Sequence, residues 1–138
     1  MKSYVFDASA FLRFIEGGAG AERVEALILQ AEAGRAQIAL SAVNWGEIYY
    51  VIARKDSANR AAAFSATIRN LPIEIVPADQ TRAEGAGIFH NRYSLPYADA
   101  FAASLADSQD ATLVTGDNDF RSVASAISVE FLPASGKP

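Results

Sequence analysis

Short apolar runs alternate with longer amphipathic segments along almost the whole sequence, and this alternation constrains the fold more than any other feature. The apolar runs are rich in β-branched and aromatic residues, and they have the length of strands buried on both faces of a parallel sheet. They lie at residues 3–6, 37–40, 73–76, 111–115 and 127–132. Because strands separated by helices pair in parallel through right-handed crossovers, the pattern predicts an α/β fold with helices on both faces of a parallel sheet.

The segments between these runs carry apolar residues at helical spacing and residues typical of helix ends. Ser41, Ser57 or Asn59, and Asp79 suit N-caps, and Pro96 suits the first turn of a helix. Helices are therefore expected over residues 8–15, 21–33, 42–55, 57–70, 80–92 and 96–108, with a short helical turn after residues 116–120. The glycine-rich segment 17–20 is expected to join two helices, because it lacks the Lys-Ser/Thr ending of a phosphate-binding loop.

The composition limits the domain count and the kinds of site. The 138 residues are 51% hydrophobic and are expected to form one domain over residues 1–138, with an exposed, frayed tail at 133–138. The absence of cysteine excludes disulfides, thiolate zinc sites and a cysteine nucleophile. The single histidine, His90, excludes a site of several imidazoles and is expected on the surface. No signal-peptide stretch opens the sequence and no window approaches the ~20 apolar residues of a membrane span, so we expect a cytoplasmic protein.

The charge balance bears on nucleic-acid binding. A net charge of −4 argues against a protein that binds nucleic acid passively by covering its phosphates. It does not exclude an enzyme that holds nucleic acid through bound metal ions and a local basic patch. Composition therefore indicates a globular domain and leaves its chemistry open.

Two aspartates come directly after predicted strands. Asp7 follows the first strand, and Asp117 follows the fourth. In an open α/β sheet, sites form beyond the carboxyl ends of the strands. Either aspartate alone is weak evidence, because an aspartate in this position is often a helix cap or a turn residue. Their shared position predicts that both open onto one rim of the sheet.

Two more acids lie in apolar helical segments. Glu47 lies in residues 45–51 (WGEIYYV), and Asp99 lies in residues 97–103 (YADAFAA). Glu47 has apolar neighbours on both sides, so the predicted helix has little polar surface around it. Asp99 would be favoured in a first helical turn by the helix dipole, so a solvent-facing position stays open for it.

Four carboxylates in one pocket would repel one another and take up protons unless a cation compensated them. With oxygen ligands only, the fitting ions are Mg²⁺ and Mn²⁺. Such a pocket suits metal-activated water attacking a phosphodiester, and the spacing alone leaves phosphatase chemistry open.

These segments resemble the PIN domain family of metal-dependent ribonucleases, in particular its stand-alone VapC-type toxins. The matching pieces are residues 6–9 (FDAS), Glu47, residues 97–103 and residues 113–120 (LVTGDNDF), and the last is the most specific. Their order and spacing match the family over nearly the whole chain. The resemblance implies a three-layer α/β/α PIN-like (Rossmann-like) sandwich around a parallel sheet of about five strands, with an acidic site at its carboxyl rim.

By that resemblance, Asp7, Glu47, Asp99 and Asp117 are the metal-binding and catalytic carboxylates, and Asp119 is a further ligand that ranks below them. Mg²⁺ or Mn²⁺ held by the three aspartates Asp7, Asp99 and Asp117 would activate water. Glu47 would bind the ion through water or help to orient the nucleophile. Relatives with this mechanism leave a 5′-phosphate and a 3′-hydroxyl.

Supporting residues are expected around the acids. The hydroxyls of Ser9 and Thr115 are expected either to orient a carboxylate or touch a phosphate, or to cap turns. Arg13, Arg54 and Arg92 are candidate contacts for single-stranded or looped RNA. Further candidates of the same kind are Lys55, Arg60, Arg82 and Arg121.

The resemblance also implies partners. A toxin would have a VapB-like antitoxin whose tail fills the acidic groove, and members of the family commonly form homodimers. The apolar helix around residues 45–52 is a reasonable dimer interface, and Trp45, Tyr49 and Tyr50 suit core or dimer packing better than stacking on bases.

Three alternatives stay open at this stage. One is a PIN nuclease that acts in RNA maturation without being a toxin. Another is an inactive PIN-like module that only binds proteins. The third is a phosphohydrolase of the haloacid dehalogenase type, which is disfavoured because that chemistry normally wants a second aspartate two residues after the first, where this sequence has Ser9.

Overall fold

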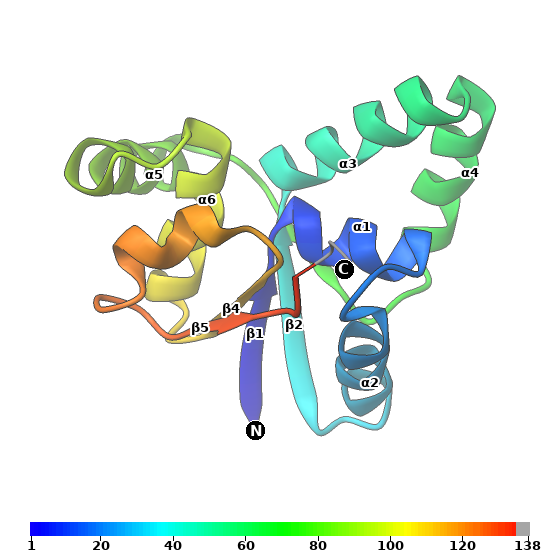
Figure 1. Ribbon diagram of the computed structural model, residues 1–138, viewed down its shortest axis with the longest axis horizontal. Coiled ribbons are helices and arrows are strands. Elements are labelled where there is room, and N and C mark those ends of the chain that lie inside the picture. Colours follow the sequence, from blue (N-terminus) through cyan, green and yellow to red (C-terminus); the bar gives the residue numbers. More distant parts are fainter. Residues whose placement is uncertain (135–138) are drawn as a thin grey trace.

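The predicted strands form one fully parallel sheet in the computed structural model, which describes residues 1–134 (Figure 1). The sheet order is β3-β2-β1-β4-β5. The strands are β1 (Lys2–Phe6), β2 (Ala36–Ser41), β3 (Glu74–Val76), β4 (Thr112–Thr115) and β5 (Val129–Phe131). The chain builds outward from β1 on one side and then returns to its other side, so the winding direction reverses between β1 and β4. Such a switch point opens a crevice at the carboxyl ends of the strands.

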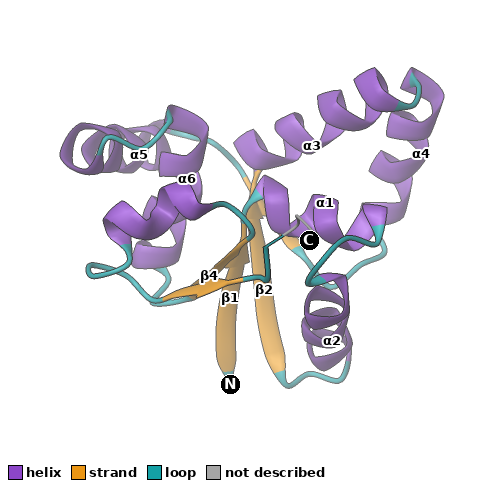
Figure 2. Ribbon diagram, in the orientation of Figure 1, coloured by secondary structure: helices purple, strands orange, loops and turns teal. Residues whose placement is uncertain are grey.

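Helices cover both faces of the sheet, which confirms the predicted three-layer architecture (Figure 2). They are α1 (Ala8–Glu16), α2 (Ala21–Glu32), α3 (Ala42–Lys55), α4 (Ala58–Ile68), α5 (Gln80–Tyr93) and α6 (Tyr97–Ser108), with a 3₁₀ helix η1 (Asn118–Val123) after β4. The pair α5 and α6 lies on one side of the sheet, and α1 and α2 lie on the other with the arm formed by α3 and α4 (Figure 1).

The alternation of side chains along β1 divides the core into two parts. Tyr4 and Phe6 point to the α1 and α2 side, whereas Val5 points to the α5 and α6 side, and all three are buried. Residues of a strand alternate between the two faces of its sheet, so a central strand that is apolar at every position serves both cores.

The predicted helix starts are confirmed at Ser41, Ser57 and Asp79, each of which caps its helix through the side chain. Pro96 is the residue before α6 rather than part of its first turn. The outer strands are shorter than predicted. Ile73 is outside β3, because its N–H donates to the Leu71 carbonyl (2.8 Å) in a turn instead of joining the sheet.

Within residues 1–134, no helix has both the length and the apolarity needed to cross a membrane. Of the predicted frayed tail, Pro133 and Ala134 are exposed, and residues 135–138 lie outside the described residues.

Candidate active site

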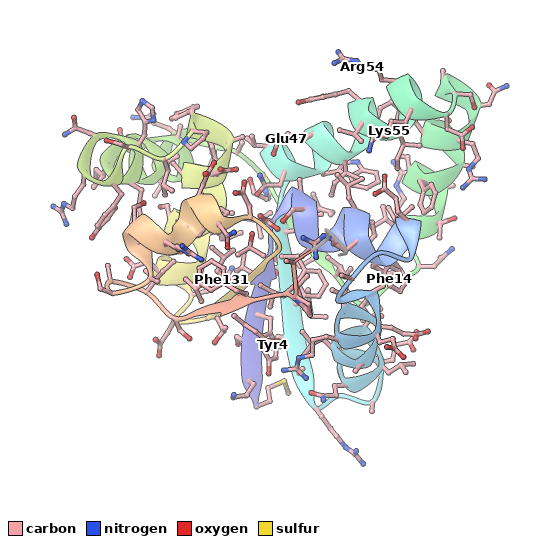
Figure 3. All side chains as sticks on the ribbon, viewed as in Figure 1. Tyr4, Phe14, Glu47, Arg54, Lys55 and Phe131 are labelled. Carbon is pink, nitrogen blue, oxygen red and sulfur yellow. The ribbon has the colours of Figure 1, made fainter. Side chains whose placement is uncertain are left out.

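Four acidic side chains gather at the carboxyl edge of the sheet. Asp7 follows β1 and Asp117 follows β4, and these neighbouring strands end side by side because Phe6 pairs with Val114. Glu47 reaches the same place from α3, where Figure 3 shows it on the amino-terminal part of the helix, and Asp99 reaches it from the first turn of α6. All four line one pocket of about 200 Å³. The residues predicted from motif spacing are therefore brought together.

Asp7 is the buried centre of a hydrogen-bond network. It caps α1 by accepting the Ala10 N–H at Oδ1 (2.9 Å), and its Oδ2 accepts the Thr115 hydroxyl (2.6 Å). The Ser9 hydroxyl lies 2.8 and 2.9 Å from the two oxygens of the same carboxylate. Ser9 Oγ in turn accepts the Gly116 N–H (2.8 Å). Both predicted hydroxyls thus contact the carboxylate of Asp7.

These hydrogen bonds oppose the effect of burial on the pKa of Asp7. Burial raises the pKa of Asp7 from 3.8 to about 6, while the hydrogen bonds from Thr115, Ala10 and Ser9 lower it and the nearby charge of Asp117 raises it. Hydrogen bonds donated to a carboxylate favour its charged form. The network therefore keeps a buried acid ionisable near neutral pH.

Three of the carboxylates lie close together: Asp99, Asp117 and Asp119 each offer an oxygen within 4.8 Å of the others. Burial and then the charges of Asp117, Asp7, Glu47 and Asp119 raise the pKa of Asp99 to about 7. Burial and the neighbouring negative charges both disfavour the ionised form of Asp99. Within residues 1–134, no salt bridge joins a lysine or arginine to any of these acids.

Asp119 ranks below the other four acids in the sequence-based prediction, but in the structure it lies with Asp99 and Asp117. Asp117 caps η1 by accepting the Asp119 N–H at Oδ1 (2.9 Å), which places the two side chains on one tight turn. Asp119 is exposed and joins the group of three, whereas Asp7 lies deeper and is not one of its members. The turn holds Asp119 beside Asp117, and the tertiary structure brings Asp99 of α6 to both.

Asn44 is a site residue that the sequence analysis missed. It is fully buried, and its Nδ2 donates to Glu47 Oε1 (3.0 Å) and to the Ala98 carbonyl (3.1 Å). The signal was present in the sequence, since Asn44 is a polar residue in an apolar helix and lies three positions before Glu47, on the same helix face.

Arg13 was predicted to contact RNA, but its guanidinium is bound to the backbone. It donates to the carbonyls of Ala19 (2.6 Å), Pro133 (2.7 Å) and Gly116 (3.1 Å). These bonds join α1 to the turn after β4 and to the chain after β5. They give Arg13 a structural role, while its contact with RNA stays a prediction.

The other two predicted RNA contacts lie apart from the pocket lining. Arg54 is exposed near the carboxyl end of α3, where its guanidinium lies 5.4 Å from the ring centre of Tyr50 (Figure 3). Arg92 is exposed on α5 and borders a different pocket of about 400 Å³, between α5 and α6.

The aromatic residues of α3 divide into two kinds. Trp45 is half-buried and packs edge-on against Phe11 and Tyr49, in accordance with the predicted packing role. Tyr50 is 50% exposed and lines the acidic pocket, so it is not a core residue. His90 is on the surface, as predicted.

A larger pocket lies elsewhere. It has a volume of about 570 Å³ and is lined at the amino edge of the sheet by residues that include Ser3, Gln37, Glu74 and Gln109. Of these four, only Glu74 is ionisable. We place the site at the smaller pocket because the clustered carboxylates and both raised aspartate pKa values are found there.

The family model of the PIN domain matches residues 4–126. The chain belongs to the PIN domain family. No curated protein matches the sequence significantly. Similar solved structures include VapBC2 from Rickettsia felis bound to a promoter DNA fragment, with a TM-score of 0.71, 17% identity and coverage of 95% of this chain and 99% of that one.

Two further structures come from Mycobacterium tuberculosis. VapC20, a toxin that cleaves the sarcin-ricin loop, aligns with a TM-score of 0.69 and 16% identity over 94% of this chain and 99% of its own. VapBC-5 aligns with a TM-score of 0.63 and 22% identity over 97% of this chain and all of its own (100%). At these identities the likeness is one of fold.

Membership of the PIN family overturns the haloacid dehalogenase alternative. The geometry agrees, because Ser9 donates its hydroxyl to Asp7 where that chemistry wants a second carboxylic acid. The acidic cluster of this PIN domain also fits a hard divalent cation, since Asp99, Asp117 and Asp119 each offer a carboxylate oxygen within 4.8 Å of the others, and burial together with nearby like charges raises the pKa of Asp99.

Proposed function

We propose that this PIN domain, acting as a single domain, is a divalent-metal-dependent endoribonuclease that hydrolyses RNA to 5′-phosphate and 3′-hydroxyl ends. The observation that carries the proposal is the convergence of Asp99, Asp117 and Asp119 within 4.8 Å, at a pocket that Asp99 and Asp117 line together with Asp7 and Glu47. Acids on well-separated parts of the chain meet here, and none of the salt bridges within residues 1–134 involves them, an arrangement that is costly unless a cation binds.

The roles proposed for the residues follow from their contacts. Asp99, Asp117 and Asp119 hold Mg²⁺ or Mn²⁺, and Asp7 faces the same pocket with its orientation fixed by Ser9 and Thr115. When bound, the cation supplies positive charge at the scissile phosphate and makes a neighbouring water more acidic. Glu47 lines the same pocket, where it would bind the ion through water and orient the attacking water, whose oxygen joins phosphorus as the bond to the 3′ oxygen breaks and that oxygen takes up a proton.

The test is cleavage of a single-stranded RNA by the purified protein with Mg²⁺, with Mn²⁺ and with EDTA. We expect cleavage only with metal and products that carry a 5′-phosphate. The variant D117N should be inactive while keeping the fold, as measured by circular dichroism. Metal-independent cleavage, or equal activity of D117N, would overturn the proposal.

We further propose that the nuclease is the toxin of a VapBC-type pair and acts in the cytoplasm, where RNA is present. The support is its likeness in fold to VapC20 and to the VapBC complexes. A VapB-like antitoxin would fill the acidic pocket, and a second copy of the chain would complete a homodimer. Induced expression should arrest growth, and co-expression of a small adjacent gene should relieve the arrest.

The same tests distinguish the proposed function from two other functions of a PIN domain. A nuclease of RNA maturation would cleave RNA without arresting growth. A module that only binds proteins would bind neither Mg²⁺ nor Mn²⁺ in isothermal titration. Sequencing of RNA 5′ ends after induction would then identify the substrate and the position of cleavage.

A further inference from the structure

Asn44 makes contacts that a residue used only for packing would not need. It is completely buried in the first turn of α3, and its Nδ2 donates to Glu47 Oε1 at 3.0 Å and to the Ala98 carbonyl at 3.1 Å. Each hydrogen of the amide group has its own acceptor. One side chain therefore contacts one of the four acids directly and the backbone immediately before another, Asp99.

The chemistry of the neighbours fixes the orientation of the amide. A carboxylate oxygen and a carbonyl oxygen are both acceptors, so rotation of the amide by 180° would place Oδ1 against two oxygens. With the NH₂ group held in this way, Oδ1 is buried and has no partner among the described residues. Asn44 can therefore adopt only one productive orientation.

The unpartnered oxygen bears on why this residue is present. A buried acceptor without a hydrogen bond lowers stability, and an apolar residue would avoid the loss. Proteins break such rules of folding at functional sites. What Asn44 provides is a link between α3, which carries Glu47, and the start of α6, which carries Asp99.

We propose that Asn44 is a positioning residue that holds Glu47 in register with Asp99 and so sets the affinity of the acidic pocket for its divalent cation. This inference rests on the proposed function. Partners that orient the residues of a metal site typically contribute 10- to 100-fold in affinity or activity. Asn44 acts through Glu47, so its effect should depend on the presence of that carboxylate.

The experiment is calorimetric titration of Mn²⁺ into the metal-free full chain, with RNA cleavage measured in parallel. We expect Asn44→Ala to weaken Mn²⁺ binding about 10-fold. The matched control is Ile48→Val, at a fully buried core position on the same helix. It should bind Mn²⁺ within about twofold of wild type, because it leaves the polar contacts intact.

A double-mutant cycle tests the route of the effect. In the Glu47→Ala background, Asn44→Ala should cause little further loss of affinity, because the bond to Ala98 then has no Glu47 carboxylate to position. An equal loss in both backgrounds, or the same affinity for Asn44→Ala and Ile48→Val, would overturn the inference. If Asn44→Ala does not fold, Asn44→Ser, which keeps one donor, replaces it in both comparisons.

The two proposals fail in distinguishable ways. A wild-type protein that binds no Mn²⁺ and cleaves no RNA overturns the proposed function, and the role of Asn44 with it. A wild type that binds and cleaves while Asn44→Ala matches the control overturns the role of Asn44 alone.

Discussion

The Thr115 hydroxyl donates to Asp7 Oδ2 at 2.6 Å, between residues that lie 108 positions apart in sequence. The bond joins the carboxyl ends of β4 and β1, the two central strands at the switch point of the sheet. Thr115 Oγ1 also accepts the Asp117 N–H (2.9 Å), so one hydroxyl connects two acids of the pocket. The ionisation of Asp7 and the position of Asp117 are coupled through this hydroxyl.

Thr115→Val should shift the pH dependence of RNA cleavage. The Thr115 hydrogen bond lowers the pKa of Asp7, which burial holds at about 6, so its removal should raise that pKa further. We expect the acid limb of the pH–rate profile to move up by about one unit, which corresponds to about 1.4 kcal/mol. Thr112→Val is the control, because Thr112 lies on the same strand and bonds Ser128 instead. An unchanged acid limb would contradict the role of Thr115.

Asp99→Asn should stabilise the metal-free protein and abolish cleavage. The substitution removes a carboxyl group whose pKa is raised to about 7 by burial and by its acidic neighbours. Asp99 is partly exposed and gains from the helix dipole, so we expect a net gain of only about 1 kcal/mol, or roughly 3–5 °C in Tm at pH 8. Thermal melts in EDTA measure the effect. Asp110→Asn is a suitable control, because Asp110 is exposed and its φ of 52° suits asparagine equally. A fall in Tm for Asp99→Asn would contradict the assumed repulsion.

The stability of the metal-free protein should decrease as the pH rises from about 4 to about 7. The pKa values of Asp7 and Asp99 in the folded state, about 6 and about 7, lie above the ordinary value of 3.8. The folded state therefore binds more protons than the unfolded state in this interval, and stability is lost as these protons leave. We expect a lower Tm at pH 8 than at pH 5 in EDTA, and restoration of the Tm at pH 8 by Mn²⁺.

Other groups also titrate over this range, so the comparison for the pH experiment is the double variant D7N/D99N. Its Tm should change less between pH 5 and pH 8 than that of the wild type. Parallel curves for the two proteins would show that these aspartates do not carry the pH dependence.

Gly116→Ala should disturb the turn that carries Asp117 and Asp119. A Cβ at this position would lie 2.6 Å from Nη2 and 2.7 Å from Cζ of Arg13, whose guanidinium is bound to three carbonyls. We expect a loss of about 1–2 kcal/mol in stability and a severalfold loss of cleavage, because the guanidinium must leave the Gly116 carbonyl. Gly87→Ala is the control, since a Cβ there has nothing within 4 Å and alanine favours the helix. Wild-type cleavage by Gly116→Ala would contradict the role given to Arg13.

The main acids were predictable because each stands out in its local context. Asp7 and Asp117 end apolar strands, and Glu47 lies in an apolar helix. Asn44 stands out in the same way, as a polar residue in an apolar helix, but its bonds to Glu47 and Ala98 are visible only in the tertiary structure. Arg13 could not be assigned from sequence, since arginines that bind RNA and arginines that bind backbone carbonyls look alike in a sequence.

The sequence by itself determined the layered parallel sheet, because hydrophobic periodicity and helix-cap residues act locally and are readable along the chain. It also determined that acids would follow β1 and β4. Only the tertiary structure decided that Asp119, rather than Asp7, joins Asp99 and Asp117 within 4.8 Å, and that Arg13 binds the Gly116 turn. Such outcomes depend on distances of a few ångströms between residues far apart in sequence, which packing sets and local patterns do not encode.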